Sequence, residues 1–445
     1  MYCHSHSQKD IWHMTPSKPL NIIRHSTWHS ALLAQAFWSA STFLVALYIA
    51  RHLSVEEFGL YAIGVAGKML FMTILGALVI TPLTVISGRY SDVAERSGVL
   101  KSTVNVLQLA SSIVFLSALL GEWWWDQPIL SFGVYVIGGI TVELQRRVNF
   151  IQGLVHQDLI GGAWNTGGAL AGLALLEWQG ALTLEIVFLL LGLVGLAWAV
   201  YIGRDHWISI PTKFDRSLAK EFWNIGRWGI GSNVFGYIYA QVSTFLTLGF
   251  IGAPGVAVLE LGRQLVSFVQ VIMGGMANLL HTRLAKSARH ATPDMFVREV
   301  WEVTGLQTLL GAALLVPVSW ASQIVVPLLV PGKEYDYALV STVTWILATA
   351  MIGQLLWQHP SFGVIALGKP AYGFLTRATT TAFLLPIAYG LTMRYGVVGA
   401  AWSRVFGEAI VFVLSTVMLY RAAAASDVRS VVPPIITEKG EGLAD

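Results

Sequence analysis

The chain has 445 residues, of which 55% are hydrophobic and only 12% are charged, and its formal net charge is +3. Soluble globular proteins carry about 25% charged residues, so one large buried core does not account for this composition. The apolar residues also lie in blocks of roughly 20, which as helix cross a hydrocarbon layer ~30 Å thick. The composition excludes an ordinary soluble domain and predicts an all-α, polytopic membrane protein.

The N-terminal residues predict a polar tail and no cleaved leader. The first 28 residues are rich in histidine and lack the basic segment and short apolar core of a signal peptide. We expect residues 1–28 to form a cytoplasmic tail, and we predict no metal site and no cofactor for the chain. The single cysteine, Cys3, excludes an internal disulfide.

Twelve apolar blocks predict twelve transmembrane helices. They lie near residues 29–50, 58–87, 103–121, 128–150, 158–176, 181–202, 223–250, 254–281, 299–330, 337–359, 371–393 and 396–420. Two of these blocks are long and contain Pro82, Pro317 and Pro327. Because proline removes a backbone hydrogen bond, we expect the helices to kink or end there.

The basic residues predict the orientation of these spans. With the N-terminus in the cytoplasm, 20 of the 28 lysines and arginines fall on the inner side, three in outer loops and five within spans. Cytoplasmic loops are enriched in lysine and arginine. The asymmetry therefore favours a multi-pass protein of the cell inner membrane with both termini in the cytoplasm.

The longest polar interruption, residues 203–222, divides the spans into two sets of six. We expect a cytoplasmic linker there, an N-lobe over 29–202, a C-lobe over 223–420 and a cytoplasmic tail over 421–445. Many transporters have duplicated halves and bind their substrate between them. The sequence thus predicts two six-helix bundles around a central cavity.

Charged residues inside the spans are candidate functional residues, because each costs ~2.5–3.5 kcal/mol at a helix centre. Some lie at mid-depth and others have no acidic partner on their own helix. The candidates for binding an anionic substrate in a water-filled cavity are Lys68, Arg263, Arg377 and Arg404. Lys68 and Arg263 follow a glycine in the second span of each half, which is a faint internal repeat.

A structural role is the alternative for several of these charges. Carboxylates at i,i+3 or i,i+4 spacing neutralise cations on one helix face. Such spacing pairs Glu143 with Arg146 or Arg147, Glu260 with Arg263, and Arg404 with Glu408. Arg146, Arg147 and Arg227 lie near the inner ends of their spans, from which long side chains are expected to reach the surface.

One stretch resembles a known family. Residues 35–61 read QAFWSASTFLVALYIARHLSVEEFGLY, with a polar opening to the first span and EEFGLY entering the second. This resembles bacterial polysaccharide-export and O-antigen flippases of the multidrug/oligosaccharidyl-lipid/polysaccharide exporter superfamily. Looser matches are Pro82-Leu83, Leu367-Gly368-Lys369 and the segment 395–402.

The resemblance implies two bundles around a cavity and a flippase that works by alternating access. Such a protein moves an undecaprenyl-diphosphate-linked oligosaccharide across the inner membrane for surface polysaccharide biosynthesis. A cationic cavity suits an anionic diphosphate that must leave water. Its expected partners are this lipid-linked oligosaccharide, membrane lipids and other polysaccharide-assembly proteins, and no nucleic acid.

Two other functions stay open. A cation-coupled multidrug exporter of the same superfamily is the first, although such a protein is expected to carry an unpaired acid deep in its cavity. The second is a membrane-embedded polysaccharide polymerase or ligase. The predicted outer loops are short, and the sequence has no nucleophile motif and no H-E-x-x-H, so we predict no catalytic residue and no enzyme.

Overall fold

The computed structural model describes residues 37–87, 103, 111–120, 122, 129–152, 154–207 and 216–425, and the regular structure in these ranges is helical. A helix over 37–52 and a short helix over Ser111–Leu120 accompany the labelled elements. These are α2 (Val55–Leu75), the π-helical turn η1 (Gly76–Ile80), α3 (Thr81–Ser87), α5 (Ile129–Ile151), α6 (Val155–Trp178), α7 (Leu184–Trp207), α8 (Arg216–Ile251), α9 (Ala253–His290), α10 (Pro293–Leu329), α11 (Tyr337–Ala366) and α12 (Pro370–Ala424). In the described part, seven helices are long and apolar enough to cross a membrane, which confirms the all-α polytopic class.

Each predicted span overlaps a helix in the described ranges. The last two spans share α12, which Gly396 interrupts with φ 60° and ψ −138°. Glycine suits this position because it has no Cβ to clash at positive φ. The prolines act unequally: α10 continues through Pro317 and ends two residues after Pro327, whereas the π-helical turn lies just before Pro82.

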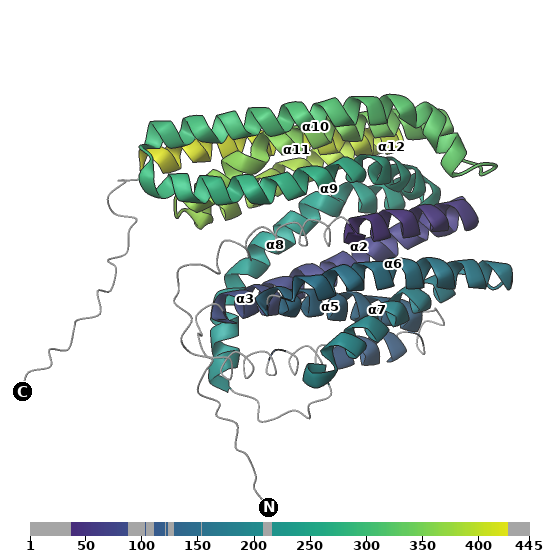
Figure 1. The fold of residues 1–445 in the computed structure, drawn as a ribbon. Helices are drawn as coiled ribbons and strands as arrows, with labels where there is room; N and C mark the ends of the chain where they lie inside the picture. The colour runs from purple at the N-terminus through teal and green to yellow at the C-terminus, as the bar shows by residue number, and fades with distance from the viewer. Residues whose placement is uncertain are drawn as a thin grey trace, which may run out of the picture.

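The helices form two groups (Figure 1), with α9 to α12 in one and α2, α3, α5, α6 and α7 in the other. We call the described residues 37–207 the N-lobe and residues 216–425 the C-lobe. α8 begins beside the group of α2 to α7 and runs to the group of α9 to α12, and the lobes meet where α2 packs against α8 and α9. Helices α7 and α8 extend into the linker predicted at 203–222, and residues 208–215 lie outside the described ranges, as do both predicted tails except 421–425.

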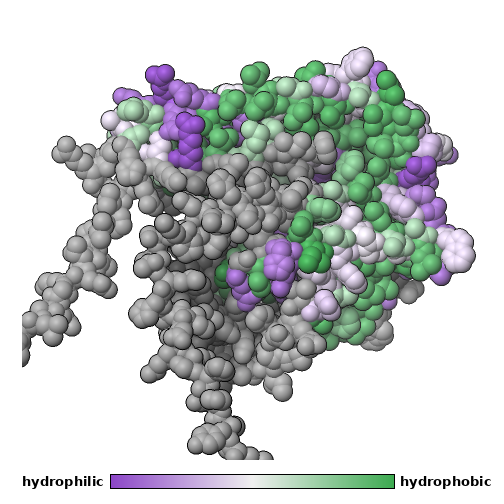
Figure 2. Space-filling view, in the orientation of Figure 1, coloured by the Kyte–Doolittle hydropathy of each residue, from purple (hydrophilic) through white to green (hydrophobic). Residues whose placement is uncertain are grey.

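The outer surface of the C-lobe is hydrophobic between its ends. Figure 2 shows hydrophobic residues across the lobe that contains α10, with hydrophilic residues gathered at its ends. On α10, Leu309, Trp320 and Leu328 are each about 70% exposed. Large apolar side chains that face outward over a whole helix suit contact with lipid chains, so this surface is that of a membrane-embedded bundle.

The lobes are closed against each other at the end that holds the turns near residues 53, 252 and 332. One hydrophobic cluster there combines buried Ile49 and Phe58 of the N-lobe with Leu261 of the C-lobe. A hydrogen bond also joins the lobes, because Lys333 Nζ donates to the carbonyl oxygen of Leu53 at 2.9 Å. Both an apolar cluster and a polar contact therefore hold the two lobes together at this end of the bundle.

Gly59 of α2 lies at a close contact between the two lobes. A methyl group at Gly59 of α2 would overlap the carbonyl oxygen of Ala253 at the start of α9, whereas one at Gly390 would meet no atom within 4 Å. We expect Gly59→Ala to separate the lobes at this end, because overpacking costs about 1–3 kcal/mol. Maleimide labelling of Leu53→Cys in a Cys3→Ser background should then be at least about fivefold faster, since Leu53 is only 3% exposed.

Gly390→Ala is the matched control for this test and should leave the labelling rate of Leu53→Cys unchanged. Equal rates in the two alanine variants would show that contact between α2 and α9 does not hold the lobes together.

Candidate functional site

Three adjoining cavities lie in the described part of the bundle, and Met69 of α2 lines all of them. The largest, about 630 Å³, lies between α2, η1 and α5 of the N-lobe and α8, α11 and α12 of the C-lobe. The other two cavities have volumes of about 260 Å³ each. Lys68 lines the one in the N-lobe, and Arg263 lines the one in the C-lobe. Arg377 and Arg404 line the largest cavity, so all four predicted cations lie at cavity walls.

Lys68 is a cation without an ion pair among the described residues. Its Nζ donates a hydrogen bond of 2.7 Å to the Tyr135 hydroxyl and lies 4.0 Å from the centroid of that ring. Its alkyl chain lies against Gly139, where an added methyl carbon would come within 2.8 Å of Lys68 Cδ. The tyrosine and the glycine of α5 position the ammonium group but leave its charge uncompensated.

Arg263 is neutralised on its own helix. Its Nη2 lies 2.5 Å from Glu260 Oε2, which confirms the predicted i,i+3 pair. Gln264 donates to the other oxygen of Glu260 at 2.5 Å, and the glutamate side chain is 5% exposed. Arg263 is therefore part of a satisfied network, and its net charge toward the cavity is smaller than that of Lys68.

Lys68 and Arg263 lie on two helices that pack side by side, α2 and α9. Gln264, the residue after Arg263, lines the cavity of Lys68, and Met69, the residue after Lys68, lines the cavity of Arg263. The glycines that precede Lys68 and Arg263 also occupy equivalent places in the two halves. A methyl group at Gly67 would meet a side chain of α5, the fourth predicted span of its half, and one at Gly262 would meet α11, the fourth predicted span of the other half.

Arg404 is held by three groups at the border of two cavities. Its Nε lies 3.1 Å from Glu408 Oε1, which confirms the predicted i,i+4 pair, and its Nη1 donates to the Tyr239 carbonyl at 3.1 Å. The guanidinium carbon also lies 4.5 Å from the centroid of the Tyr239 ring. Glu408 in turn accepts from Trp357 Nε1 at 2.5 Å. This network connects α8, α11 and α12.

Arg377 is, after Lys68, the second of the four predicted cations for which the described residues supply no carboxylate partner. It lies near the start of α12, is exposed and lines the largest cavity. Its Nη1 would lie 2.8 Å from a methyl group added at Gly236 of α8, so the guanidinium group rests on that helix at a position without a side chain.

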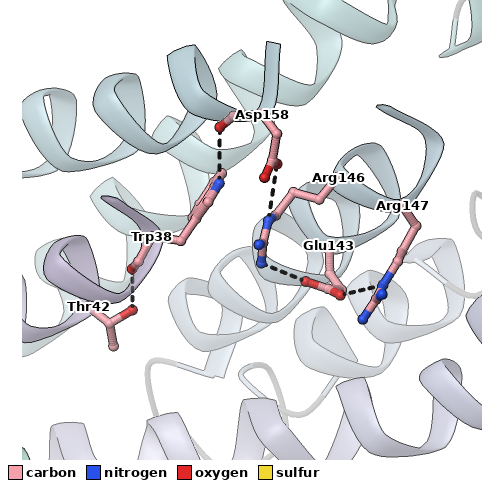
Figure 3. A network of polar contacts seen from close by, with 6 residues as sticks. All are labelled: Trp38, Thr42, Glu143, Arg146, Arg147 and Asp158. Atoms are coloured by element: carbon pink, nitrogen blue, oxygen red, sulfur yellow. Dashed lines mark hydrogen bonds and ion pairs between the residues drawn. The ribbon is translucent and has the colours of Figure 1, made fainter. Parts of the chain in front are cut away.

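Sequence reasoning missed an acid in the N-lobe. Figure 3 shows Arg146 between Glu143 on its own helix and Asp158 on α6, at 3.2 Å from each carboxylate. Trp38 donates to the Asp158 carbonyl at 3.1 Å. Asp158 is fully buried. The sequence did not indicate this, because Asp158 is the first residue of a predicted span, where an acid is expected to face water.

The same network corrects one expectation. Arg146 was expected to reach the surface, but its side chain is 17% exposed, because it pairs with two acids and packs on the Trp38 ring. Arg147 pairs with Glu143 at 3.1 Å, as its spacing predicts, and is 51% exposed. Spacing on one helix could not reveal Asp158, because its partner lies on the preceding helix.

These features define a class: a polytopic α-helical membrane protein of two lobes, closed at one end, with cavities between and within the lobes whose walls carry charged side chains. Comparison with solved structures identifies the fold more closely. The chain is similar to a multidrug resistance MATE family transporter of the MOP superfamily in its inward-facing conformation, with TM-score 0.70 and 13% identity over 93% of this chain and 99% of that one. It is also similar to the lipid II flippase MurJ in an inward closed conformation, with TM-score 0.69 and 12% identity over 91% and 90%.

An outward-facing conformation of a MATE family transporter matches with TM-score 0.63 and 13% identity over 93% of this chain and 99% of that one. No protein-family model and no curated protein sequence matches the chain. The chain thus has the fold of the MOP superfamily transporters.

Proposed function

We propose that the chain is a flippase that moves a polyprenyl-diphosphate-linked oligosaccharide across the inner membrane by alternating access. The observation that carries this proposal is that Lys68 and Arg377 line the cavities without a carboxylate partner among the described residues. An uncompensated cation within a membrane has a high free-energy cost, and binding of an anion offsets that cost. A diphosphate supplies that anion.

The four predicted cations take different parts in this proposal. Arg377, near the start of α12, meets the diphosphate in the largest cavity, and Lys68 binds it deeper in the N-lobe. Arg263 and Arg404 are neutralised by Glu260 and Glu408, so they line the path and fix its walls.

The closure at one end supports alternating access. The lobes touch near residues 53, 252 and 332, whereas the largest cavity extends into the opposite halves of the helices, where Thr81 and Ile365 line it. In the predicted orientation this is an inward-open conformation. The higher TM-score to the inward-facing than to the outward-facing MATE structure is in line with it.

A multidrug exporter is the second candidate, favoured by the similarity to MATE family transporters and by buried Asp158. Asp158 pairs with Arg146, however, so it is not the unpaired acid that a cationic drug would need. The excess of unpaired cations at the cavity walls favours an anionic substrate.

The proposal is tested with purified protein in liposomes that carry undecaprenyl diphosphate N-acetylglucosamine in the outer leaflet. We expect the sugar to become inaccessible to an added galactosyltransferase many times faster than in empty liposomes. Joining the lobes with a bis-methanethiosulfonate cross-linker between Leu53→Cys and Lys333→Cys, in a Cys3→Ser background, should stop this movement, because Lys333 of the C-lobe contacts the Leu53 carbonyl of the N-lobe. A reductant, which cleaves the cross-link, should restore it. Efflux of ethidium without movement of the lipid would instead establish the exporter.

A further inference from the structure

The C-lobe wall of the largest cavity carries neutral polar and aromatic side chains. Gln241 of α8 and Gln354 and Trp357 of α11 line it, and we call these three residues the amide–indole wall. Arg377 lines the same cavity. A ligand that fills this space therefore meets a cation and a neutral hydrogen-bonding surface at the same time.

Gln241 is a buried amide whose hydrogen bonds are incomplete. It is 3% exposed, and its Oε1 has no partner among the described residues. Its Nε2 donates only to the sulfur of Met69, at 3.7 Å, and thioether sulfur is a weak acceptor. Buried amides are normally satisfied, so a side chain of this kind at a cavity wall is poised to bind the hydroxyl or amide of a ligand.

Trp357 presents a ring in a fixed orientation. Its Nε1 donates to Glu408 at 2.5 Å, and Arg404 holds that glutamate from the other side at 3.1 Å. With the N–H group engaged, the ring offers the cavity an apolar face. Gln354 lies three residues earlier on α11, so its amide projects from the same helix face.

We infer that the amide–indole wall binds the sugar rings of the substrate next to the diphosphate, an inference that rests on the proposed function. A pyranose ring has a rim of hydroxyl groups and a face of C–H groups. The rim suits amides, which both donate and accept hydrogen bonds, and the C–H face suits an indole ring. Sites of this kind use a few placed polar groups for specificity, so the wall distinguishes sugar-bearing from bare lipid diphosphates.

The test measures the affinity of the purified full-length protein for two probes, geranylgeranyl diphosphate and the same lipid with one N-acetylglucosamine on the diphosphate. We expect the wild type to bind the sugar-bearing probe more tightly. Gln241→Leu and Gln354→Leu should each weaken it about tenfold, the effect of one lost hydrogen bond, and leave the bare diphosphate unchanged. Gln270→Leu is the matched control, since Gln270 is exposed and lines the neighbouring cavity.

Binding of the bare probe shows that each variant is folded. If Gln241→Leu binds neither probe, Gln354→Leu and Trp357→Leu, at half-buried positions, decide the question. The inference is overturned if folded variants of the wall lose no affinity for the sugar-bearing probe, or lose it equally for both probes. If the wild type binds neither probe, the proposed function itself is wrong.

Discussion

Replacing Lys68 by glutamine is expected to slow movement of a lipid-linked diphosphate about 10- to 100-fold. Hydrogen bonds to charged groups contribute about 1.5–3 kcal/mol, and this one forms in a cavity where few other charges are uncompensated. Lys68 has no ion pair among the described residues, so in the free protein the change removes only its hydrogen bond of 2.7 Å to the Tyr135 hydroxyl. The liposome assay with undecaprenyl diphosphate N-acetylglucosamine measures the rate.

Two controls give the result its meaning. Lys68→Arg keeps the charge and should retain most of the transport rate. Lys369→Gln removes a lysine that lines none of the three cavities, so it should leave the rate unchanged. Arg377→Gln should also slow transport, and less so than Lys68→Gln, because Arg377 is more exposed to solvent. A Lys68→Gln protein that is folded and moves the lipid at the wild-type rate would refute the anion role of this residue.

The sequence predicts the positions of the helices in the described ranges well, because each apolar span is determined by local apolar content. It also predicts the ion pairs Glu260–Arg263 and Arg404–Glu408, since i,i+3 and i,i+4 neighbours share a helix face whatever the tertiary structure. The π-helical turn before Pro82 had no signal beyond the proline itself.

Contacts between helices could not be predicted in this way. Nothing in the spacing of Tyr135 or Asp158 indicates that the first accepts from Lys68 and the second pairs with Arg146. Depth alone therefore ranked Lys68 and Arg263 as equals. The structure separates them, because Arg263 is neutralised by a nearly buried glutamate and Lys68 is not.

The second large effect is expected on stability, from Glu408→Leu. Glu408 is 1% exposed and accepts from both Arg404 and Trp357. Its loss leaves the Arg404 guanidinium group unpaired at a largely buried position, and breaking a buried pair in this way costs about 3–5 kcal/mol. The thermal midpoint of the purified protein, followed by tryptophan fluorescence, should fall clearly.

An exposed pair with the same i,i+4 spacing provides the control. Arg298 and Glu302 lie 2.9 Å apart on α10 with side chains 82% and 56% exposed. Surface pairs contribute about 0–1 kcal/mol, so Glu302→Leu should hardly change the midpoint. Equal shifts in the two leucine variants would mean that solvent reaches Glu408 and that the Arg404 network adds little to stability.

The double variant Arg404→Leu with Glu408→Leu separates stability from recognition. Replacing a buried pair by apolar residues is often neutral, so the midpoint should recover most of the loss. The Trp357 indole, however, no longer has the carboxylate that fixes its ring. We therefore expect a folded protein that binds bare geranylgeranyl diphosphate normally but no longer prefers the sugar-bearing probe. A double variant that keeps this preference would show that the orientation of Trp357 does not depend on Glu408.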